Sequence, residues 1–312
     1  MRTFEDYLDP ELMPAAPEVL GTLFSLVLTD IPAARSLLLQ LNEVAESMNG
    51  AFDGTIDETH VPGLEGDPDI RIRIYRQTNA SSPQSTLIWL HGGGCVMGSV
   101  ADPQIYRYTD IMTVISVEYR LAPEHRAPAA ARDACAILEY LHANADKFQI
   151  DRDGLVLGGV SGGAGVAACA ALMNRDRSNV PVRGQFLLSP MVDDKIETSL
   201  SALKFPEWAW SQDHNRTAWS LYAETPNPSP YAAALRAQSF SGLPPAYLMC
   251  GGLDLFRDAT IQYAQALMGA DVSAELAIYP GAPHGFDVMS PMAKTSLRAI
   301  AHQRDALQQF SL

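Results

Sequence analysis

A serine framed by glycines is the feature of this sequence best suited to covalent chemistry. Residues 159–163 match G-x-S-x-G, with Ser161 at the centre, between an apolar run and a run of small residues. In a strand-to-helix turn, the glycines avoid collisions with neighbouring backbone, and the helix N-terminus favours negative charge near the serine Oγ. The pattern also fits a glycine-rich turn without chemistry, so a base, an acid and an oxyanion hole must be found elsewhere.

Three further signals follow predicted strands. The residues 91–94, His-Gly-Gly-Gly, follow a strand, Asp254 follows another and His284 follows the last. Ligands of open parallel sheets bind beyond the carboxyl ends of the strands, and consecutive glycines let backbone N–H groups turn toward a ligand. The order Ser, Asp, His along the chain is that of α/β-hydrolases. Asp258 heads a helix and is predicted to be its N-cap rather than the acid.

The elements that position these residues alternate between strands and helices. This pattern predicts a mostly parallel sheet with right-handed crossovers. We expect strands at 70–75, 86–90, 113–119, 155–160, 184–189, 246–250 and 274–279. We expect helices at 129–143, from the serine turn to about 174, at 258–268 and at 292–309.

Two segments fall outside this alternation. Residues 1–50 carry apolar positions at helical spacing and are predicted to form two or three amphipathic helices. Residues 191–230 hold three of the four tryptophans and are predicted to be an inserted helical segment. The predicted domains are therefore an N-terminal helical cap part (1–50), an α/β core (51–190 and 231–312) and an inserted cap part (191–230).

Composition narrows the partners and the compartment. The net charge of −14 over 312 residues argues against nucleic acid or an anionic membrane as partners. The N-terminus has no basic signal region and the apolar run at 19–28 is too short to span a bilayer, so a cytoplasmic location is expected. The cysteines are predicted to be buried free thiols, because they lack metal-ligand or C-x-x-C spacing: Cys95, Cys135, Cys169 and Cys250.

Together, these motifs resemble those of the hormone-sensitive-lipase-like carboxylesterases. The similar stretches run from about residue 70 to the C-terminus, and they are HGGG at 91–94, YRLAPEH at 119–125, the serine turn, LDLFRD at 253–258 and HGF at 284–286. The resemblance implies an α/β-hydrolase fold, and the helical residues at the N-terminus fit that family's cap.

The resemblance also implies roles for individual residues. It implies Ser161 as the nucleophile, His284 as the base and Asp254 as the acid that orients the histidine. The backbone N–H groups implied to form the oxyanion hole are those of Gly93, Gly94 and Gly162. No metal or cofactor is needed for this chemistry.

The sequence departs from the family's usual residues around the site. Val160 and Gly162 flank the serine where the family usually has Asp or Thr and then Ala, so we expect a looser turn at Gly162. Leu255 replaces a usual proline, and Cys95 stands where an aromatic residue often follows the glycines. Cys95 is expected to pack against the site rather than act as a second nucleophile, and Glu124 to buttress the site loops.

Four residues are predicted to line the substrate pocket: Cys95, Trp208, Trp210 and Phe286. The two tryptophans could instead pack the cap onto the core. We expect a roofed pocket of roughly 300–1,000 Å³, the usual range for small ligands.

The predicted function is hydrolysis of short- to medium-chain carboxylic esters through an acyl-serine intermediate. The partner is then a small-molecule ester, and a homodimer is possible. The same residues could hydrolyse amides, formamides or lactones. A non-catalytic ligand receptor on this scaffold is the remaining alternative, but receptors that resemble the family lack the catalytic histidine, and His284 is present.

Overall fold

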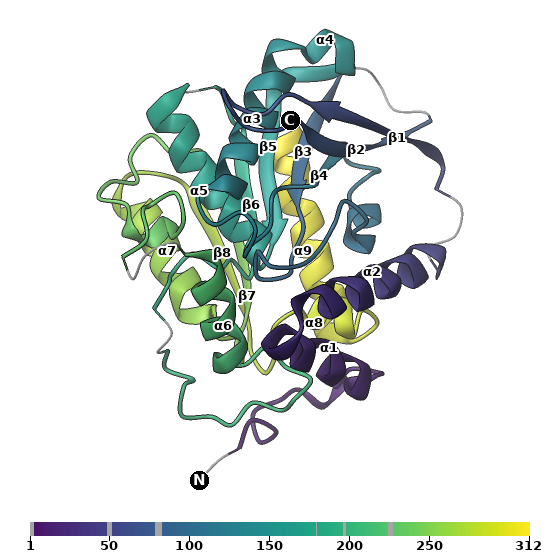
Figure 1. Ribbon diagram of the computed structural model, residues 1–312, viewed down its shortest axis with the longest axis vertical. Helices are drawn as coiled ribbons and strands as arrows, with labels where there is room; N and C mark the ends of the chain where they lie inside the picture. Colours follow the sequence, from purple (N-terminus) through teal and green to yellow (C-terminus); the bar gives the residue numbers. More distant parts are fainter. Residues whose placement is uncertain (1–2, 49–51, 79–82, 179, 196–197, 224–226) are drawn as a thin grey trace.

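One twisted eight-stranded sheet runs through the molecule (Figure 1). The computed structural model describes residues 3–48, 52–78, 83–178, 180–195, 198–223 and 227–312. The strand order is β1-β2-β4-β3-β5-β6-β7-β8, with β1 and β2 antiparallel to their neighbours and the rest parallel. The strands are β1 (Gly54–Val61), β2 (Ile70–Gln77), β3 (Gln84–Leu90), β4 (Thr113–Val117), β5 (Ile150–Val160), β6 (Gly184–Leu188), β7 (Ala246–Gly251) and β8 (Ala274–Tyr279). The predicted mostly parallel sheet is confirmed.

The central strands are apolar throughout because both faces of the sheet are covered. In β3, Leu87 and Trp89 lie in one buried core, whereas Ile88 and Leu90 lie in the other. Successive side chains of a strand point to opposite faces, so a fully buried strand needs a continuous apolar run. At the antiparallel edge, β2 instead alternates buried isoleucines with partly exposed arginines, as predicted.

Helices cover the two faces of the sheet. One core includes buried residues of α3 (Ala129–Ala143), α5 (Gly162–Arg177) and α7 (Arg257–Gly269), and the other includes those of α9 (Lys294–Ser311) (Figure 1). The bounds of α3 and β8 agree with the prediction, while β5 begins at Ile150 rather than at 155. The short elements are η1 (Pro10–Leu12), η2 (Pro103–Arg107), α4 (Ala145–Phe148), η3 (Ala234–Arg236) and α8 (Phe286–Met289).

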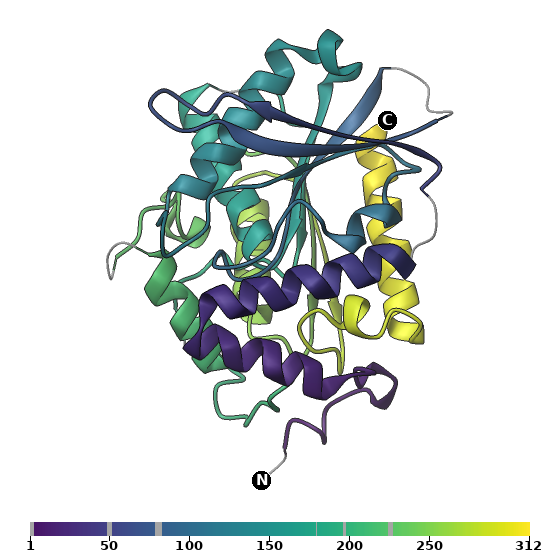
Figure 2. The same cartoon turned by 45° about the vertical axis from the view of Figure 1, so that its right-hand side comes forward.

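The described part of residues 1–50 contains two α-helices, as predicted: α1 (Pro17–Thr29) and α2 (Ile31–Met48). Figure 2 shows them side by side across one end of the molecule. The prediction of a helical segment at 191–230 is wrong for most of its described residues, because only α6 (Gln212–Tyr222) is an α-helix there. The predicted boundary at 50/51 and parts of the insertion (196–197 and 224–226) lie outside the described residues.

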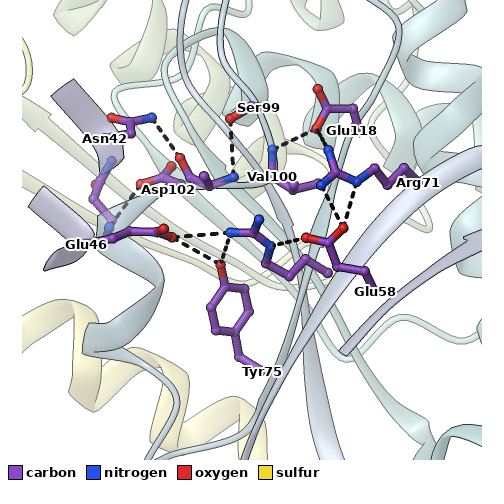
Figure 3. A network of polar contacts seen from close by, with 12 residues as sticks. Asn42, Glu46, Glu58, Arg71, Tyr75, Ser99, Val100, Asp102 and Glu118 are labelled. Carbon is purple, nitrogen blue, oxygen red and sulfur yellow. Dashed lines mark hydrogen bonds and ion pairs between the residues drawn. The ribbon is translucent and has the colours of Figure 1, made fainter. Parts of the chain in front are cut away.

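Polar contacts fix α2 against the antiparallel edge of the sheet (Figure 3). Glu46 of α2 lies 3.4 Å from the Arg73 guanidinium of β2, and Arg73 Nε also donates to Glu58 of β1 at 2.7 Å. Nearby, Asn42 Nδ2 donates to the carbonyl oxygen of Ala101 at 2.7 Å. These contacts hold α2 beside the loop that follows β3. None of the described helices is long and apolar enough to cross a membrane.

Candidate active site

Ser161 occupies a strained turn between β5 and α5. Its φ of 57° and ψ of −119° lie in a region that non-glycine residues rarely adopt. The Ser161 N–H donates to the carbonyl oxygen of Leu188 at 2.8 Å, which anchors the turn to β6. A Cβ at Gly159 or Gly163 would lie 2.4 or 2.0 Å from the carbonyl oxygen of Leu90. The two glycines of the G-x-S-x-G pattern are therefore required by the close approach of β3.

The structure brings the three predicted polar side chains into one hydrogen-bonded chain. His284 Nε2 lies 2.9 Å from Ser161 Oγ, and His284 Nδ1 lies 2.7 Å from Asp254 Oδ2. Asp254 is fully buried, and its Oδ1 accepts a hydrogen bond from the Phe256 N–H at 2.9 Å. A carboxylate can only accept from the imidazole, so Nδ1 carries the proton and Nε2 is free to accept the serine proton.

The environment of Asp254 keeps it ionised. Burial by itself favours the neutral acid, but electrostatic attraction to His284, the hydrogen bond with His284 and the Phe256 N–H outweigh burial and lower the pKa of Asp254. The Phe256 ring stands edge-on to the His284 ring, with centroids 5.2 Å apart. The histidine is thus held between a carboxylate, an aromatic ring and the serine.

Asp258 is not the N-cap that the sequence predicts. The helix α7 begins at Arg257, so Asp258 lies inside its first turn and Phe256 occupies the N-cap position. Asp258 accepts a hydrogen bond from the Ser199 N–H at 2.8 Å and pairs with Arg257. The prediction of an N-cap was wrong because the helix begins at Arg257, which places its N-cap two residues before Asp258.

The glycine loop after β3 folds over the start of α5. Gly93 and Gly94 have positive φ angles of 115° and 60°, and Cys95, which follows them, has 61°. Within the described residues, the backbone N–H groups of Gly93 and Gly94 donate to no partner. A Cβ at Gly162 would lie only 3.0 Å from the Gly94 nitrogen, so the predicted oxyanion-hole residues are neighbours in space.

Replacing Gly162 with alanine tests how tight this contact is. The added Cβ would lie 2.7 Å from the Cys95 nitrogen, a backbone atom that cannot swing away. The turn is thus tight rather than loose, and we expect Gly162→Ala to displace the glycine loop and lower kcat by about 10–100-fold, somewhat less than deletion of an oxyanion-hole donor. The control is Gly269→Ala, where a Cβ meets nothing within 4 Å. Wild-type kcat in Gly162→Ala would contradict this account of the loop.

A residue of α2 fixes the other side of the glycine loop. Arg35 of α2 donates from Nε to the Val96 carbonyl oxygen and from a terminal nitrogen to the Ala122 carbonyl oxygen, both at 2.7 Å. It also pairs with both carboxylate oxygens of Glu124, at 3.0 and 2.7 Å. Glu124 thus contacts the site loops through Arg35, which the sequence analysis did not single out.

A cavity of about 190 Å³ opens beside Ser161 and His284, smaller than predicted. Residues of α1 and α2 form much of its apolar wall, together with Val160 and Trp210: Leu20, Leu23, Phe24 and Leu38. The sequence analysis counted these four among the apolar positions of the N-terminal helices but did not predict that they line the pocket.

Of the four predicted pocket residues, Trp210 lines the cavity. Trp208 packs edge-on against Phe4 at 5.8 Å, and Phe286 packs against Tyr279 at 5.5 Å. Cys95 is 2% exposed, and its Sγ faces the Gly162 carbonyl oxygen at 3.6 Å. None of these three lines the cavity.

The cysteines are buried free thiols, as predicted. Burial raises the pKa of the Cys95 and Cys135 thiols to about 12 and also raises those of Cys169 and Cys250. Because the thiolate is the reactive form, iodoacetamide at pH 8 should leave kcat unchanged. Urea-unfolded protein, in which all four thiols react, is the control. Inactivation that substrate prevents would show that Cys95 is a reactive group of the site.

Metal ligands are not grouped in the described ranges. No three His, Cys, Asp or Glu side chains of those residues come close enough to hold a metal ion.

Comparisons with known proteins show the family of this chain. Residues 87–288 match a family model described as alpha/beta hydrolase fold. The chain is 31% identical to carboxylic ester hydrolase LipN of Mycobacterium tuberculosis over 296 residues, which cover 89% of this chain and 77% of LipN. It is 29% identical to carboxylesterase NlhH of the same species, over 96% of this chain and 97% of NlhH.

Solved structures give the same picture. A bacterial heroin esterase superposes with a TM-score of 0.85 at 35% identity, covering 98% of both chains. Esterase LipW of Mycobacterium marinum superposes with a TM-score of 0.81 at 33% identity, covering 96% of this chain and 98% of LipW. The family model covers well over half of this chain, and the glycine loop and Ser161 lie within the matched region. The chain therefore belongs to the alpha/beta hydrolase fold family.

Proposed function

We propose that this protein is a serine carboxylesterase that hydrolyses small esters through an acyl-serine intermediate. The observation that carries the proposal is the chain of hydrogen bonds from Ser161 through His284 to Asp254. Ser161 and His284 both line a cavity that a substrate could enter. The relatives reported above carry the names of ester hydrolases, which supports an ester as the substrate.

The geometry supports a two-step reaction. His284 Nε2 takes the proton of Ser161 as Oγ attacks the ester carbonyl carbon. The negative charge that develops on the carbonyl oxygen is stabilised by the backbone N–H groups of Gly93, Gly94 and Gly162. As the carbon–oxygen bond to the alcohol breaks, His284 returns the proton to the leaving alcohol.

Water then completes the cycle. His284 takes a proton from a water molecule, which attacks the acyl-serine carbon. The bond to Ser161 Oγ breaks, the proton returns to the serine, and the carboxylic acid leaves. Asp254 stabilises the imidazolium that exists between these transfers.

The cap predicted from residues 1–50 and 191–230 limits the size of the substrate in this proposal. The described parts of both segments reach the cavity wall, through Leu23 and Leu38 from the first and Trp210 from the second. A cavity of about 190 Å³ favours acyl chains at the short end of the range expected from the sequence.

A panel of p-nitrophenyl esters from acetate to palmitate tests the proposal. Each buried methylene contributes about 0.8 kcal/mol, so kcat/KM should rise about fourfold per carbon from acetate toward butyrate. It should fall once the chain exceeds the cavity, with little hydrolysis of palmitate. Matched p-nitroanilides and lactones are run beside the esters. Faster hydrolysis of the anilides or lactones than of the butyrate ester would show that the preferred substrate is an amide or a lactone. Equal rates for palmitate and butyrate would show that the cavity does not limit chain length.

A further inference from the structure

The geometry points to Arg35 of α2 as a positioning residue for the oxyanion hole. Through two peptide groups of the glycine loop, here residues 91–97, Arg35 orients the Gly94 N–H and strengthens it as a hydrogen-bond donor. Arg35 does not line the cavity beside Ser161, so it acts on the reaction only through this backbone. This inference rests on the proposed function, because the oxyanion hole belongs to the proposed ester hydrolysis.

Two peptide groups connect Arg35 to Gly94. Arg35 Nε donates to the Val96 carbonyl oxygen at 2.7 Å. The other end of that peptide group, the Met97 N–H, donates to the Gly93 carbonyl oxygen at 3.1 Å. The Gly93 carbonyl in turn shares its peptide plane with the Gly94 N–H. Because the C=O and N–H of a trans peptide point in opposite directions, fixing this carbonyl directs the Gly94 N–H away from residues 96–97.

The Gly94 nitrogen lies beside the serine turn. A Cβ at Gly162, the residue after Ser161, would lie 3.0 Å from it, and both Gly94 and Ser161 line the cavity. Its N–H donates to no acceptor among the described residues. In the proposed reaction the carbonyl oxygen of the substrate is that acceptor, and the negative charge on it is stabilised only by donors that already point at it. The orientation of this one peptide group therefore bears on kcat.

A second contact of the same side chain fixes the residue that follows Gly94. A terminal nitrogen of Arg35 donates to the Ala122 carbonyl oxygen at 2.7 Å. The Ala122 N–H donates to the Cys95 carbonyl oxygen at 2.9 Å. Cys95 has a φ of 61°, which is uncommon for a residue with a side chain, so its backbone conformation needs such support. Arg35 thus holds the glycine loop at two points, one on each side of Cys95.

The charge of Arg35 adds to this effect. A cation at the head of a chain of hydrogen bonds polarises each peptide group in turn, which makes the last N–H a stronger donor. Within the described part of the chain, no other lysine or arginine donates to the backbone of the glycine loop. The ion pair with Glu124 has less consequence, because the two side chains are 28% and 54% exposed and exposed ion pairs contribute little to stability.

A purely structural tether between α2 and the loops is the competing explanation. Asn42 and Glu46 of α2 also hold this helix, through the Ala101 carbonyl oxygen and Arg73 (Figure 3). Loss of Arg35 should therefore leave α2 in place and lower Tm only modestly. A tether would change Tm without changing how well the protein stabilises an oxyanion, so the test must measure that stabilisation directly.

Arg35→Met and Arg35→Gln form a nearly isosteric pair that isolates the contact with Val96. The glutamine amide nitrogen takes the place of Arg35 Nε, so it can donate to the Val96 carbonyl oxygen, whereas the methionine methyl group at that place cannot. Arg35→Met should lower kcat for p-nitrophenyl butyrate by about 10–100-fold, less than the loss of a whole donor, with KM changed by less than about threefold. Arg35→Gln should have a kcat several-fold above that of Arg35→Met at a similar Tm. Equal kcat in the two variants would overturn the path through Val96.

Two inhibitors of one shape measure the stabilisation of the oxyanion. The carbonyl carbon of 1,1,1-trifluoro-2-heptanone is attacked by an activated serine and gives a tetrahedral oxyanion, whereas 2-heptanone binds without forming an adduct. In Arg35→Met, Ki for the trifluoromethyl ketone should rise by about the factor by which kcat falls, because both report on the stabilised oxyanion. Ki for 2-heptanone should stay near the wild-type value. An equal change in Ki for both inhibitors would show that Arg35 shapes the cavity and does not position the oxyanion hole.

Arg304→Met is the matched control for the loss of an arginine. Arg304 of α9 is 31% exposed, pairs with Asp110 and donates to the Arg107 carbonyl oxygen, away from the site. Its replacement should lower Tm and leave kcat and the ratio of the two Ki values unchanged. If Arg35→Met does not fold because Glu124 is left unpaired, the double variant Arg35→Met/Glu124→Gln removes that charge and is measured in its place.

Failure of this inference and failure of the proposed function give different results. Hydrolysis of p-nitrophenyl butyrate at equal kcat in wild-type protein and Arg35→Met would overturn the role of Arg35 and leave the esterase proposal intact. If wild-type protein hydrolyses no ester, the proposed function fails. The rate at which a fluorophosphonate labels Ser161 then tests Arg35, because the phosphoryl oxygen takes the place of the oxyanion. Labelling should be about tenfold or more slower in Arg35→Met, and equal rates would overturn the inference.

Discussion

Replacing Ser161 with alanine is expected to lower kcat for p-nitrophenyl butyrate by about 10⁴- to 10⁶-fold. In the proposed mechanism, the hydroxyl removed is the group that His284 activates and that forms the bond to the acyl group. The proposed oxyanion-hole donors and the cavity remain, so some rate enhancement over water should persist. The fold should be retained, because the turn is held by backbone contacts to β3 and β6 that do not involve Oγ.

A buried serine away from the site is the matched control for this change. Ser116 is fully buried in β4, and its Oγ has no hydrogen-bond partner among the described residues. Ser116→Ala removes the same atom and should keep the wild-type kcat. Circular dichroism and Tm establish that both variants are folded. If Ser161→Ala kept more than a small fraction of the activity, another group would be the nucleophile.

Changing Asp254 to asparagine is expected to cost about 10⁴-fold in kcat. The buried carboxylate accepts from His284 Nδ1–H and so leaves Nε2 as the base. An amide at this position can instead donate to Nδ1, which moves the imidazole proton to Nε2. The histidine would then donate to Ser161 and could not take its proton. The loss also removes the charge that stabilises the imidazolium.

Asp258→Asn is the comparison that makes this prediction specific. Asp258 is four residues away and pairs with Arg257 and the Ser199 N–H, so its loss should reduce Tm slightly and leave kcat within a few-fold. Measuring kcat for both variants at pH 8 decides between the carboxylates. A mild loss of kcat in Asp254→Asn with a severe loss in Asp258→Asn would show that Asp258, and not Asp254, is the acid.

The sequence could predict that the three polar side chains of the candidate site meet, because each of them follows a strand. Each of Ser161, Asp254 and His284 follows an apolar run, and the carboxyl ends of parallel strands meet at one edge of the sheet. Gly159 and Gly163 of the serine turn could also be predicted from the sequence, since only glycine tolerates the close approach of the Leu90 carbonyl oxygen. Local patterns were therefore enough to identify residues that lie in contact although they are far apart in the sequence: Ser161 and His284 are separated by 123 positions.

The cavity could not be predicted in the same way. Much of its apolar wall comes from α1 and α2. The amphipathic pattern of these helices predicts which face is apolar but not which part of the protein that face will cover. Trp208 and Trp210 are two residues apart, yet one packs against Phe4 and the other lines the cavity. Arg35 likewise acquires its partners only through tertiary contacts. No local pattern distinguishes such residues from ordinary surface or core positions.

The most direct test of the central claim is covalent labelling of the native protein with a fluorophosphonate, followed by peptide mass spectrometry. An activated serine attacks the phosphorus and keeps the adduct, whereas an unactivated hydroxyl does not react. We expect a single adduct on Ser161, loss of activity in proportion to labelling, and no adduct on Ser161→Ala. An adduct on another residue, formed at the same rate in Ser161→Ala and accompanied by loss of activity in wild-type protein, would contradict the assignment of Ser161 as the nucleophile.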